Sequence, residues 1–369
     1  MNKLFIIHYY PIDYFPPVMN LIETLEKKID ITVSSTQRSN SLVEFKGIRV
    51  KIFRKIKENK SDNSVKILIK YFIFTLFTLG LLIRKRPNAI LYYESISAFP
   101  AYLYKYFFNR KVKLCIHYHE YMTPEEYKKN GMRLSRFNLK LEKSWLLQNA
   151  IWISQTNEYR KAFFLKDNPN ISKSICHLLP NYPPQNWLCT HKNHVGDIVK
   201  CVYIGSLSLK DTFVLDFCRW VNLQGGKVQF DIYSFNFHQD TFDAIEALHS
   251  PFIKFYKEGV KYMEIPHILK FYDVGVLLYR AQTLNFKFNE TNKFYEYLIC
   301  GLDVWYPKEM TLLHEMDKSL FAPDIKEMDI NNGLFPKLDF SSRLVNNSSY
   351  NMFSEKVYES FLQLINNNF

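Results

Sequence analysis

The chain has 369 residues, of which 47% are hydrophobic and 17% are aromatic. This length exceeds what one hydrophobic core usually supports, and the apolar content excludes a disordered chain, so we expect two packed domains. Charge is unevenly distributed. Residues 1–200 carry 32 Lys and Arg against 15 Asp and Glu, whereas residues 201–369 carry 16 against 21. The basic half suits an anionic partner, either a nucleic acid or an anionic membrane.

The cysteines give no sign of a disulfide framework or a zinc site. No two of the six stand at C-x-x-C spacing, and most lie in apolar surroundings, which is typical of reduced core residues in a cytosolic protein. The first seven residues are too short an apolar run for a secretory signal. We therefore expect a cytoplasmic protein.

The first half of the chain alternates between strand-like and helix-like segments. Helices are predicted through Leu21 and Leu25, over 97–107, over 130–149 and from Asn157, and a polar loop over 55–63. Short apolar runs predict strands at residues 4–7, 31–33, 48–52, 89–93, 112–120 and 150–155. This alternation predicts a parallel sheet that is covered on both faces.

Two segments of the first half could contact a membrane. Residues 71–83 are uncharged and lie between Lys70 and the basic run 84–86, but a spanning helix needs roughly 20 apolar residues. A core helix is favoured over an interfacial one, because apolar helices of this length are common in α/β domains. The helix over 130–149 is basic and amphipathic, so it suits either a membrane surface or a core contact with a solvated basic side.

The strand over 112–120 ends in His119 and Glu120. Ligands of open α/β sheets bind beyond the carboxyl ends of the strands, which makes both residues candidates for a functional site. His117 and His119 alternate onto one face, yet a metal pair lacks a third ligand nearby. The other interpretations are a histidine satisfied by local hydrogen bonds and a role on the acceptor side of a reaction.

The second half repeats the α/β pattern after a polar stretch, residues 185–197, that is expected to be a linker. Strands are predicted at residues 199–205, 227–233 and 252–255, and an amphipathic helix at 354–365. The first of these strands ends at Gly205 and leads toward a helix near Asp211. A glycine there lets backbone N–H groups approach a phosphate without a Cβ in the way.

The most informative stretch is residues 288–305. Thr291 and Asn292 are N-cap residue types and Gly301 suits the C′ position, so a helix is predicted between them. Lys293 and Glu296 project from one side of its first turn, where unpaired N–H groups favour an anion. The amine can bind phosphate and the carboxylate can accept hydrogen bonds from a ribose diol. The alternative is a solvated charge pair on a surface helix.

The sequence from Lys293 to Val304 resembles the K-x-x-E-Y-x-x-x-G-x-P-V signature of bacterial GT-B glycosyltransferases, close to glycosyltransferase family four (group 1). Segments 14–17, 178–184, 259–269 and 272–280 are similar to further family motifs, in the same order. The resemblance implies an α/β fold with two Rossmann-like domains facing across a cleft. These would be an acceptor-side domain over 1–185 and a donor-binding domain over 199–350, with a C-terminal helix over 351–369 returning to the first.

The resemblance also implies roles for single residues. Glu296 would bind the donor ribose and Lys293 would lie near the donor phosphates, while His119, Glu120 and Glu290 are the catalytic candidates. The other implied donor-binding residues are Gly205, Ser206 and Lys210 in the phosphate loop, Gly259 and Val260 at the base, and Tyr279 at the strand end beneath the donor. The sequence departs from the family pattern at Ser206, Phe288 and Asp303, and with Phe288 in place of the usual carboxylate, retaining and inverting chemistry both stay open.

The resemblance predicts a hexosyltransferase that moves a sugar from a nucleotide-diphosphate sugar to a lipid-linked or other saccharide acceptor. The expected process is bacterial surface polysaccharide biosynthesis (capsule, O-antigen or lipopolysaccharide), on the inner face of the cytoplasmic membrane. No metal or other cofactor is expected, because an Asp-x-Asp pair is absent. Two alternatives are a sugar-nucleotide epimerase and a non-catalytic GT-B subunit or sugar-binding partner. Nucleic acid is disfavoured as a partner, since no known binding module is recognised.

Overall fold

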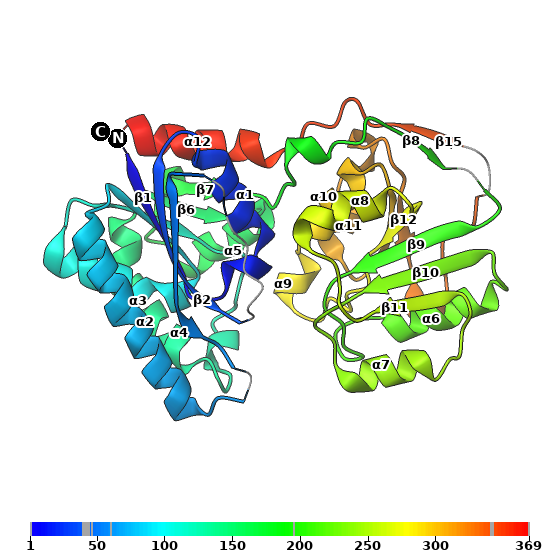
Figure 1. Ribbon diagram of the computed structural model, residues 1–369, viewed down its shortest axis with the longest axis horizontal. Helices are drawn as coiled ribbons and strands as arrows, with labels where there is room; N and C mark the ends of the chain where they lie inside the picture. Colours follow the sequence, from blue (N-terminus) through cyan, green and yellow to red (C-terminus); the bar gives the residue numbers. More distant parts are fainter. Residues whose placement is uncertain are drawn as a thin grey trace. The chain divides into compact units, whose positions relative to one another are not determined.

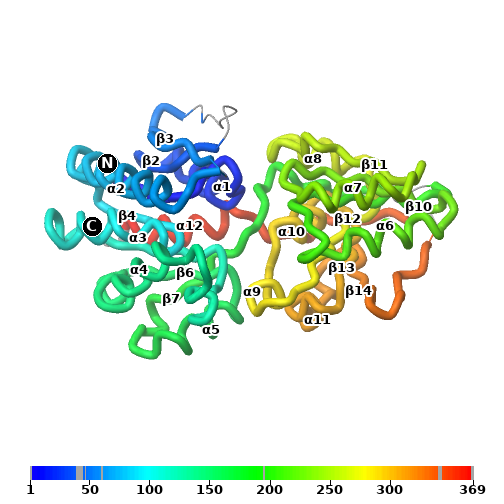
Figure 2. The backbone as a smooth tube through the Cα atoms, turned by 90° about the horizontal axis from the view of Figure 1, so that it is seen from below, coloured from blue at the N-terminus to red at the C-terminus, as the bar shows by residue number. Residues whose placement is uncertain are grey.

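The computed structural model describes residues 2–38, 45, 47–59, 61–194, 196–339 and 343–367. The chain divides into two compact units, coloured by sequence in Figures 1 and 2. Unit 1 comprises residues 1–180 together with 354–369, and unit 2 comprises residues 181–353. The chain therefore leaves unit 1 after Pro180 and returns to it at Ser354.

Unit 1 is built on a seven-stranded sheet in which every neighbouring pair is parallel. Its spatial order is β3-β2-β1-β4-β5-β6-β7, so the strand order reverses between β1 and β4. Every residue of β4 is buried, because helices cover both faces of the sheet. The strands are β1 (Lys3–His8), β2 (Asp30–Gln37), β3 (Val50–Lys57), β4 (Ala89–Tyr93), β5 (Lys113–His117), β6 (Trp152–Gln155) and β7 (Cys176–Leu178).

The helices of unit 1 form two layers. The C-terminal helix α12 packs against α1 on one face, where the Tyr358 hydroxyl donates to the Pro17 carbonyl oxygen at 2.8 Å. On the other face α2 contacts α3, and α3 contacts α4 (Figure 1). The helices are α1 (Pro16–Leu25), α2 (Ser64–Lys85), α3 (Ala98–Leu103), α4 (Arg133–Leu141), α5 (Glu158–Asp167) and α12 (Ser354–Asn367). The predicted return of the C-terminal helix is confirmed.

Unit 2 repeats this architecture with a six-stranded parallel sheet in the order β11-β10-β9-β12-β13-β14. Both sheets thus follow the Rossmann-like order in which the first strand lies beside the fourth. The strands are β9 (Val199–Ile204), β10 (Val228–Tyr233), β11 (Ile253–Tyr256), β12 (Val274–Val276), β13 (Asp303–Pro307) and β14 (Ile325–Met328), with an antiparallel pair β8 (His191–His194) and β15 (Arg343–Asn346). The helices are α6 (Val214–Leu223), α7 (Gln239–Glu246), α8 (Ile265–Leu269), α9 (Leu284–Lys287), α10 (Asn292–Ile299) and α11 (Thr311–Glu315).

The structure corrects two predicted loops. The expected linker over 185–197 belongs to unit 2, because Trp187 is buried against Tyr262 and β8 pairs with β15. The expected polar loop over 55–63 begins too early, since β3 continues to Lys57 by pairing with β2. Polar and charged side chains concealed β8 and the second half of β3, because hydrogen bonding to a neighbouring strand does not require an apolar pattern.

Helix α2 is longer than the apolar run that predicted it. It begins at Ser64, where the Asn63 side chain accepts a hydrogen bond from the Lys66 amide and caps the helix. Among the described residues, α2 is the one helix that is long and apolar enough to cross a membrane, judged by length and composition alone. Of its most apolar window, 33% is buried. It is neither a fully buried core helix nor a fully exposed one.

Candidate active site

The predicted donor-binding residues follow the carboxyl ends of three strands of unit 2, or lie on the helix that comes after them. Gly205 follows β9, Gly259 and Val260 follow β11, and Tyr279 follows β12. Gly259 has a φ of +63°, and a Cβ at that position would lie 3.0 Å from the ring of Phe235, so a glycine is required there. This edge of a parallel sheet is where α/β proteins bind ligands.

The first backbone amide of the expected phosphate loop, that of Gly205, is already engaged in a hydrogen bond within unit 2. The Gly205 N–H donates to the Tyr233 carbonyl oxygen at 3.1 Å, which fixes the loop to the end of β10. Ser206 and Lys210 are exposed. Ser208 orders the rest of the loop, because its hydroxyl donates to the Asp211 carboxylate at 2.6 Å and accepts from the Asp211 amide at 3.0 Å. Ser206, Lys210 and Asp211 are thus the side chains that this loop presents to solvent.

Helix α10 is held tightly against two strands. Its N-cap is Thr291, and Gly301 follows its C-cap with a φ of +78°, as the sequence predicted. The Tyr297 hydroxyl accepts a hydrogen bond from the Ile204 amide at 3.1 Å, one residue before Gly205. A Cβ at Gly275 of β12 would lie 2.2 Å from the ring of Tyr297, so the helix packs directly on the β12 backbone. These contacts bring α10 next to the start of the phosphate loop.

The predicted charge pair lies on this helix and is buried. Lys293 Nζ lies 2.6 Å from Glu296 Oε2, and Glu296 is only 1% exposed. Glu296 Oε1 is buried without a hydrogen-bond partner. The interpretation as a solvated surface pair is therefore wrong. A buried carboxylate oxygen that lacks a donor carries a desolvation penalty, which a ligand hydroxyl would relieve.

Two further candidates in unit 2 are engaged with aromatic neighbours. Glu290 is buried and accepts a hydrogen bond from the Tyr295 hydroxyl, and the ring of Tyr295 packs edge-on against Tyr182 at 4.7 Å. Tyr279 stacks on Phe286 with ring centroids 5.6 Å apart. Glu290, which precedes α10, is thus positioned by a side chain of that helix, whereas Tyr279 presents a flat ring at the end of β12.

The remaining candidates, His119 and Glu120, lie in unit 1 just beyond the end of β5. The His119 ring stacks on Tyr93 at 4.8 Å and on Phe15 at 5.4 Å. Burial lowers the pKa of His119 well below its usual value, so the imidazole is neutral at neutral pH, and its Nε2 is buried without a partner. His117 contacts the same ring, but among the described residues no group of three or more metal-ligating side chains occurs. Glu120 is exposed.

Sequence reasoning missed Glu94, which organises this edge of unit 1. Its Oε1 accepts hydrogen bonds from the amides of His119, at 2.6 Å, and Glu120, at 3.2 Å. Its φ of +60° with ψ of +153° is a strained backbone conformation for a residue with a Cβ. Burial, and then the charge of Glu120, raises the pKa of Glu94 to about 8. One signal was available, since Glu94 directly follows the carboxyl end of β4.

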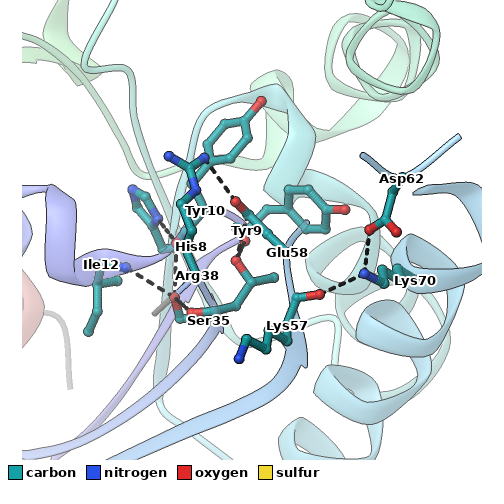
Figure 3. A network of polar contacts seen from close by, with 11 residues as sticks. His8, Tyr9, Tyr10, Ile12, Ser35, Arg38, Lys57, Glu58, Asp62 and Lys70 are labelled. Carbon is teal, nitrogen blue, oxygen red and sulfur yellow. Dashed lines mark hydrogen bonds and ion pairs between the residues drawn. The ribbon is translucent and has the colours of Figure 1, made fainter. Parts of the chain in front are cut away.

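The opening loop, which contains the segment at 14–17, is fixed by a network that Figure 3 shows at the ends of β1, β2 and β3. Thr36 Oγ1 donates to the Tyr9 carbonyl oxygen at 2.7 Å and lies 2.7 Å from the Glu58 carboxylate. Ser35 Oγ donates to the Tyr10 carbonyl oxygen at 2.9 Å, and Arg38 pairs with Glu58 at 3.1 Å. The loop is therefore held over the same sheet edge as His119 and Glu94.

No protein-family model and no curated protein matches the chain. Solved structures do match it. HepE of Anabaena in complex with UDP and glucose is 12% identical with a TM-score of 0.66, and the apo lipopolysaccharide outer core galactosyltransferase WaaB is 11% identical with a TM-score of 0.58. Each match covers 100% of both chains. This chain has the GT-B glycosyltransferase fold.

The same fold also includes enzymes of another class. A protein described as a UDP-N-acetylglucosamine 2-epimerase from Listeria monocytogenes is 10% identical with a TM-score of 0.51, and the match covers 99% of this chain and 88% of that one. The GT-B fold predicted from the sequence is confirmed. At 10% to 12% identity, the likeness to these structures establishes the fold alone.

Proposed function

We propose that the protein is a glycosyltransferase whose unit 2 binds a nucleotide-diphosphate sugar. The observation that carries the proposal is the carboxylate of Glu296, buried at the sheet edge with one oxygen paired to Lys293 and the other without a donor. A ribose diol supplies the missing donors, since its two hydroxyl groups can bond to one carboxylate. Lys293 and the first turn of α10 supply positive potential for the diphosphate.

The chemistry that this site favours is departure of a nucleoside diphosphate. Bond cleavage at the anomeric carbon transfers negative charge to the leaving diphosphate, and fixed positive groups lower the barrier by stabilising that charge. Lys293, which pairs with Glu296, is the first candidate for a cation that stabilises the leaving diphosphate, and the exposed Lys210 is the second. No step here requires a metal, because the lysines and the helix N-terminus supply the positive charge.

We propose a lipid-linked saccharide of bacterial surface polysaccharide assembly as the acceptor. Support comes from the likeness to WaaB and from the excess of cations in residues 1–200. In unit 1 the acceptor side would include His119, whose buried Nε2 lacks a partner, and Glu94, which orders the adjoining loop. A neutral imidazole at this position can either donate or accept a hydrogen bond with an acceptor hydroxyl.

The departure at Asp303 does not argue for an inactive subunit, because Asp303 pairs with Arg343 and accepts from the Asp324 amide at 2.8 Å. It therefore fixes β15 to the sheet. The epimerase alternative rests on the shared fold, and a soluble sugar nucleotide as sole substrate leaves the basic half of the chain unexplained.

The test is a thermal-shift panel of nucleoside diphosphates and nucleotide sugars, because a ligand that binds only the folded state raises the unfolding midpoint. One diphosphate is expected to raise the midpoint in the wild type. Glu296→Ala should weaken its binding about 10- to 100-fold, the loss expected for hydrogen bonds to a charged group. Glu246→Ala, which changes an exposed glutamate at the end of α7, is the matched control and should bind normally.

Two results would redirect the proposal. If no diphosphate raises the midpoint, the non-catalytic alternative gains the support that the transferase loses. If UDP-N-acetylglucosamine is epimerised without any acceptor, the epimerase alternative is correct.

A further inference from the structure

Helix α2 presents a continuous apolar stripe to solvent. The stripe consists of side chains that are 39% to 65% exposed and lie on one face of the helix: Val65, Leu68, Ile69, Phe72, Leu76 and Ile83. The exposed Gly80 takes the position between the last two. Helical side chains three or four residues apart lie on one side, so the stripe runs the length of the helix. Soluble proteins rarely leave so long an apolar strip uncovered, which marks it as an interaction surface.

The opposite side of α2 is fastened to unit 1 by polar contacts. The Tyr71 hydroxyl donates to the Ile96 carbonyl oxygen at 3.0 Å and accepts from the Asn138 side chain at 2.7 Å. Thr78 shares a hydrogen bond of 2.7 Å with Ser34 of β2. If α2 left the sheet to cross a bilayer, these polar groups would lose their partners in hydrocarbon, which is strongly unfavourable. The helix therefore stays on the sheet and exposes only its stripe.

The charged residues of α2 are all cations. The helix contains no Asp or Glu, and Arg84 and Lys85 form its last turn. Near its start Lys66 is exposed, whereas Lys70 pairs with Asp62, just before the helix. Beyond this turn lies a cavity of about 220 Å³, whose charged lining residues are Lys3, Arg49, Lys51, Lys85 and Asp30. Partial burial, and then the charges of Lys51, Arg84 and Lys3, lowers the pKa of Lys85. The end of the helix is thus a concentration of cations that favours bound anions.

We propose that α2 docks unit 1 onto an anionic lipid bilayer, with the helix lying in the plane of the interface. Its apolar stripe enters the boundary between headgroups and acyl chains, and Lys66 at its start and Arg84 and Lys85 at its end contact lipid phosphates. Exposed Phe107 and Phe108, in the helical turn that contacts α2 and follows α3, add apolar side chains that can enter the same boundary. The proposal does not depend on sugar transfer.

Charge complementarity distinguishes the bilayer from a second copy of the chain. In a symmetric dimer through the stripe, the basic ends of α2 would meet the same surface of the other copy, and the helix has no carboxylate to pair with them. An anionic membrane supplies both an apolar layer and negative charge. The charge of this surface therefore favours docking on a bilayer over dimerisation through the stripe.

Flotation of the full chain with lipid vesicles tests the proposal. Vesicles of phosphatidylcholine with about one third phosphatidylglycerol should carry the wild type, and pure phosphatidylcholine should carry much less. The double variant Leu68→Asp with Phe72→Asp should bind at least tenfold more weakly, because it removes two inserting side chains and adds repulsion. Both positions are more than half exposed, so the variant should fold.

The matched control is Leu223→Asp, which places the same charge at a residue that is 84% exposed in unit 2 and should leave flotation unchanged. A second variant, Lys51→Gln with Lys85→Gln, should reduce the preference for the anionic lipid several-fold. The proposal is overturned if the stripe variant floats like the wild type or if the wild type ignores anionic vesicles. It is equally overturned if the wild type is a dimer that the stripe variant dissociates without any change in flotation.

Discussion

Replacing Lys293 with Met probes how far the carboxylate of Glu296 is removed from water. Glu296 is 1% exposed, Lys293 Nζ lies 2.6 Å from one of its oxygens, and the other oxygen has no donor. Removing one partner of a buried ion pair leaves an uncompensated charge and typically costs about 3–5 kcal/mol. We therefore expect Lys293→Met to lower the free energy of unfolding by an amount in that range, measured by urea unfolding at pH 8.

A second variant separates loss of the pair from loss of packing. Adding Glu296→Gln to Lys293→Met removes the buried charge, so most of the lost stability should return, and the double-mutant cycle should show strong coupling. Lys308→Met is the matched control, because Lys308 pairs with Asp329 at 2.5 Å on the surface and should matter little. A loss in Lys293→Met no larger than in this control would refute the claim that Glu296 is desolvated.

Two further predictions concern the packing of Gly275 in β12 and the buried carboxyl group of Glu142 in unit 1. Gly275→Ala should destabilise unit 2 by about 1–3 kcal/mol or more, because its Cβ would lie 2.2 Å from the ring of Tyr297. The control is Gly80→Ala in α2, whose Cβ would meet no atom within 4 Å and which should stabilise the protein slightly. Thermal unfolding of the two variants compares them. Burial raises the pKa of Glu142 from 4.5 to about 7, so the stability it contributes is full below pH 4.5 and is lost as the pH rises to about 7. Glu142→Gln should abolish this loss of about 3 kcal/mol, which unfolding midpoints at pH 5 and pH 8 would reveal.

The parts of the fold that the sequence predicted well are those whose pattern is local. The run 89–93 is apolar at every position, as expected for a strand covered on both faces, and it coincides with β4. Helix α10 begins after Thr291 and ends before Gly301, because capping chemistry depends on residues adjacent in the chain.

The features that escaped prediction depend on distant residues. Strand β8 is polar and acquires its structure by pairing with β15, more than a hundred residues later. The strained conformation of Glu94 is imposed by the amides of the loop after β5, which a local sequence pattern does not report. The burial of Glu296 follows from the contact of Tyr297 with Gly275 and Ile204, so the Lys-x-x-Glu spacing alone was compatible with an exposed pair.

The central claim is that Glu296 recognises the ribose of a nucleoside diphosphate. The most direct measurement is calorimetric titration of the wild type and of Glu296→Ala with the diphosphate that the panel selects and with its 2′,3′-dideoxy analogue. We predict that the wild type prefers the diol form by at least tenfold and that Glu296→Ala binds both forms with the same weak affinity. Equal affinities in the wild type, or a preference that survives in Glu296→Ala, would contradict the account.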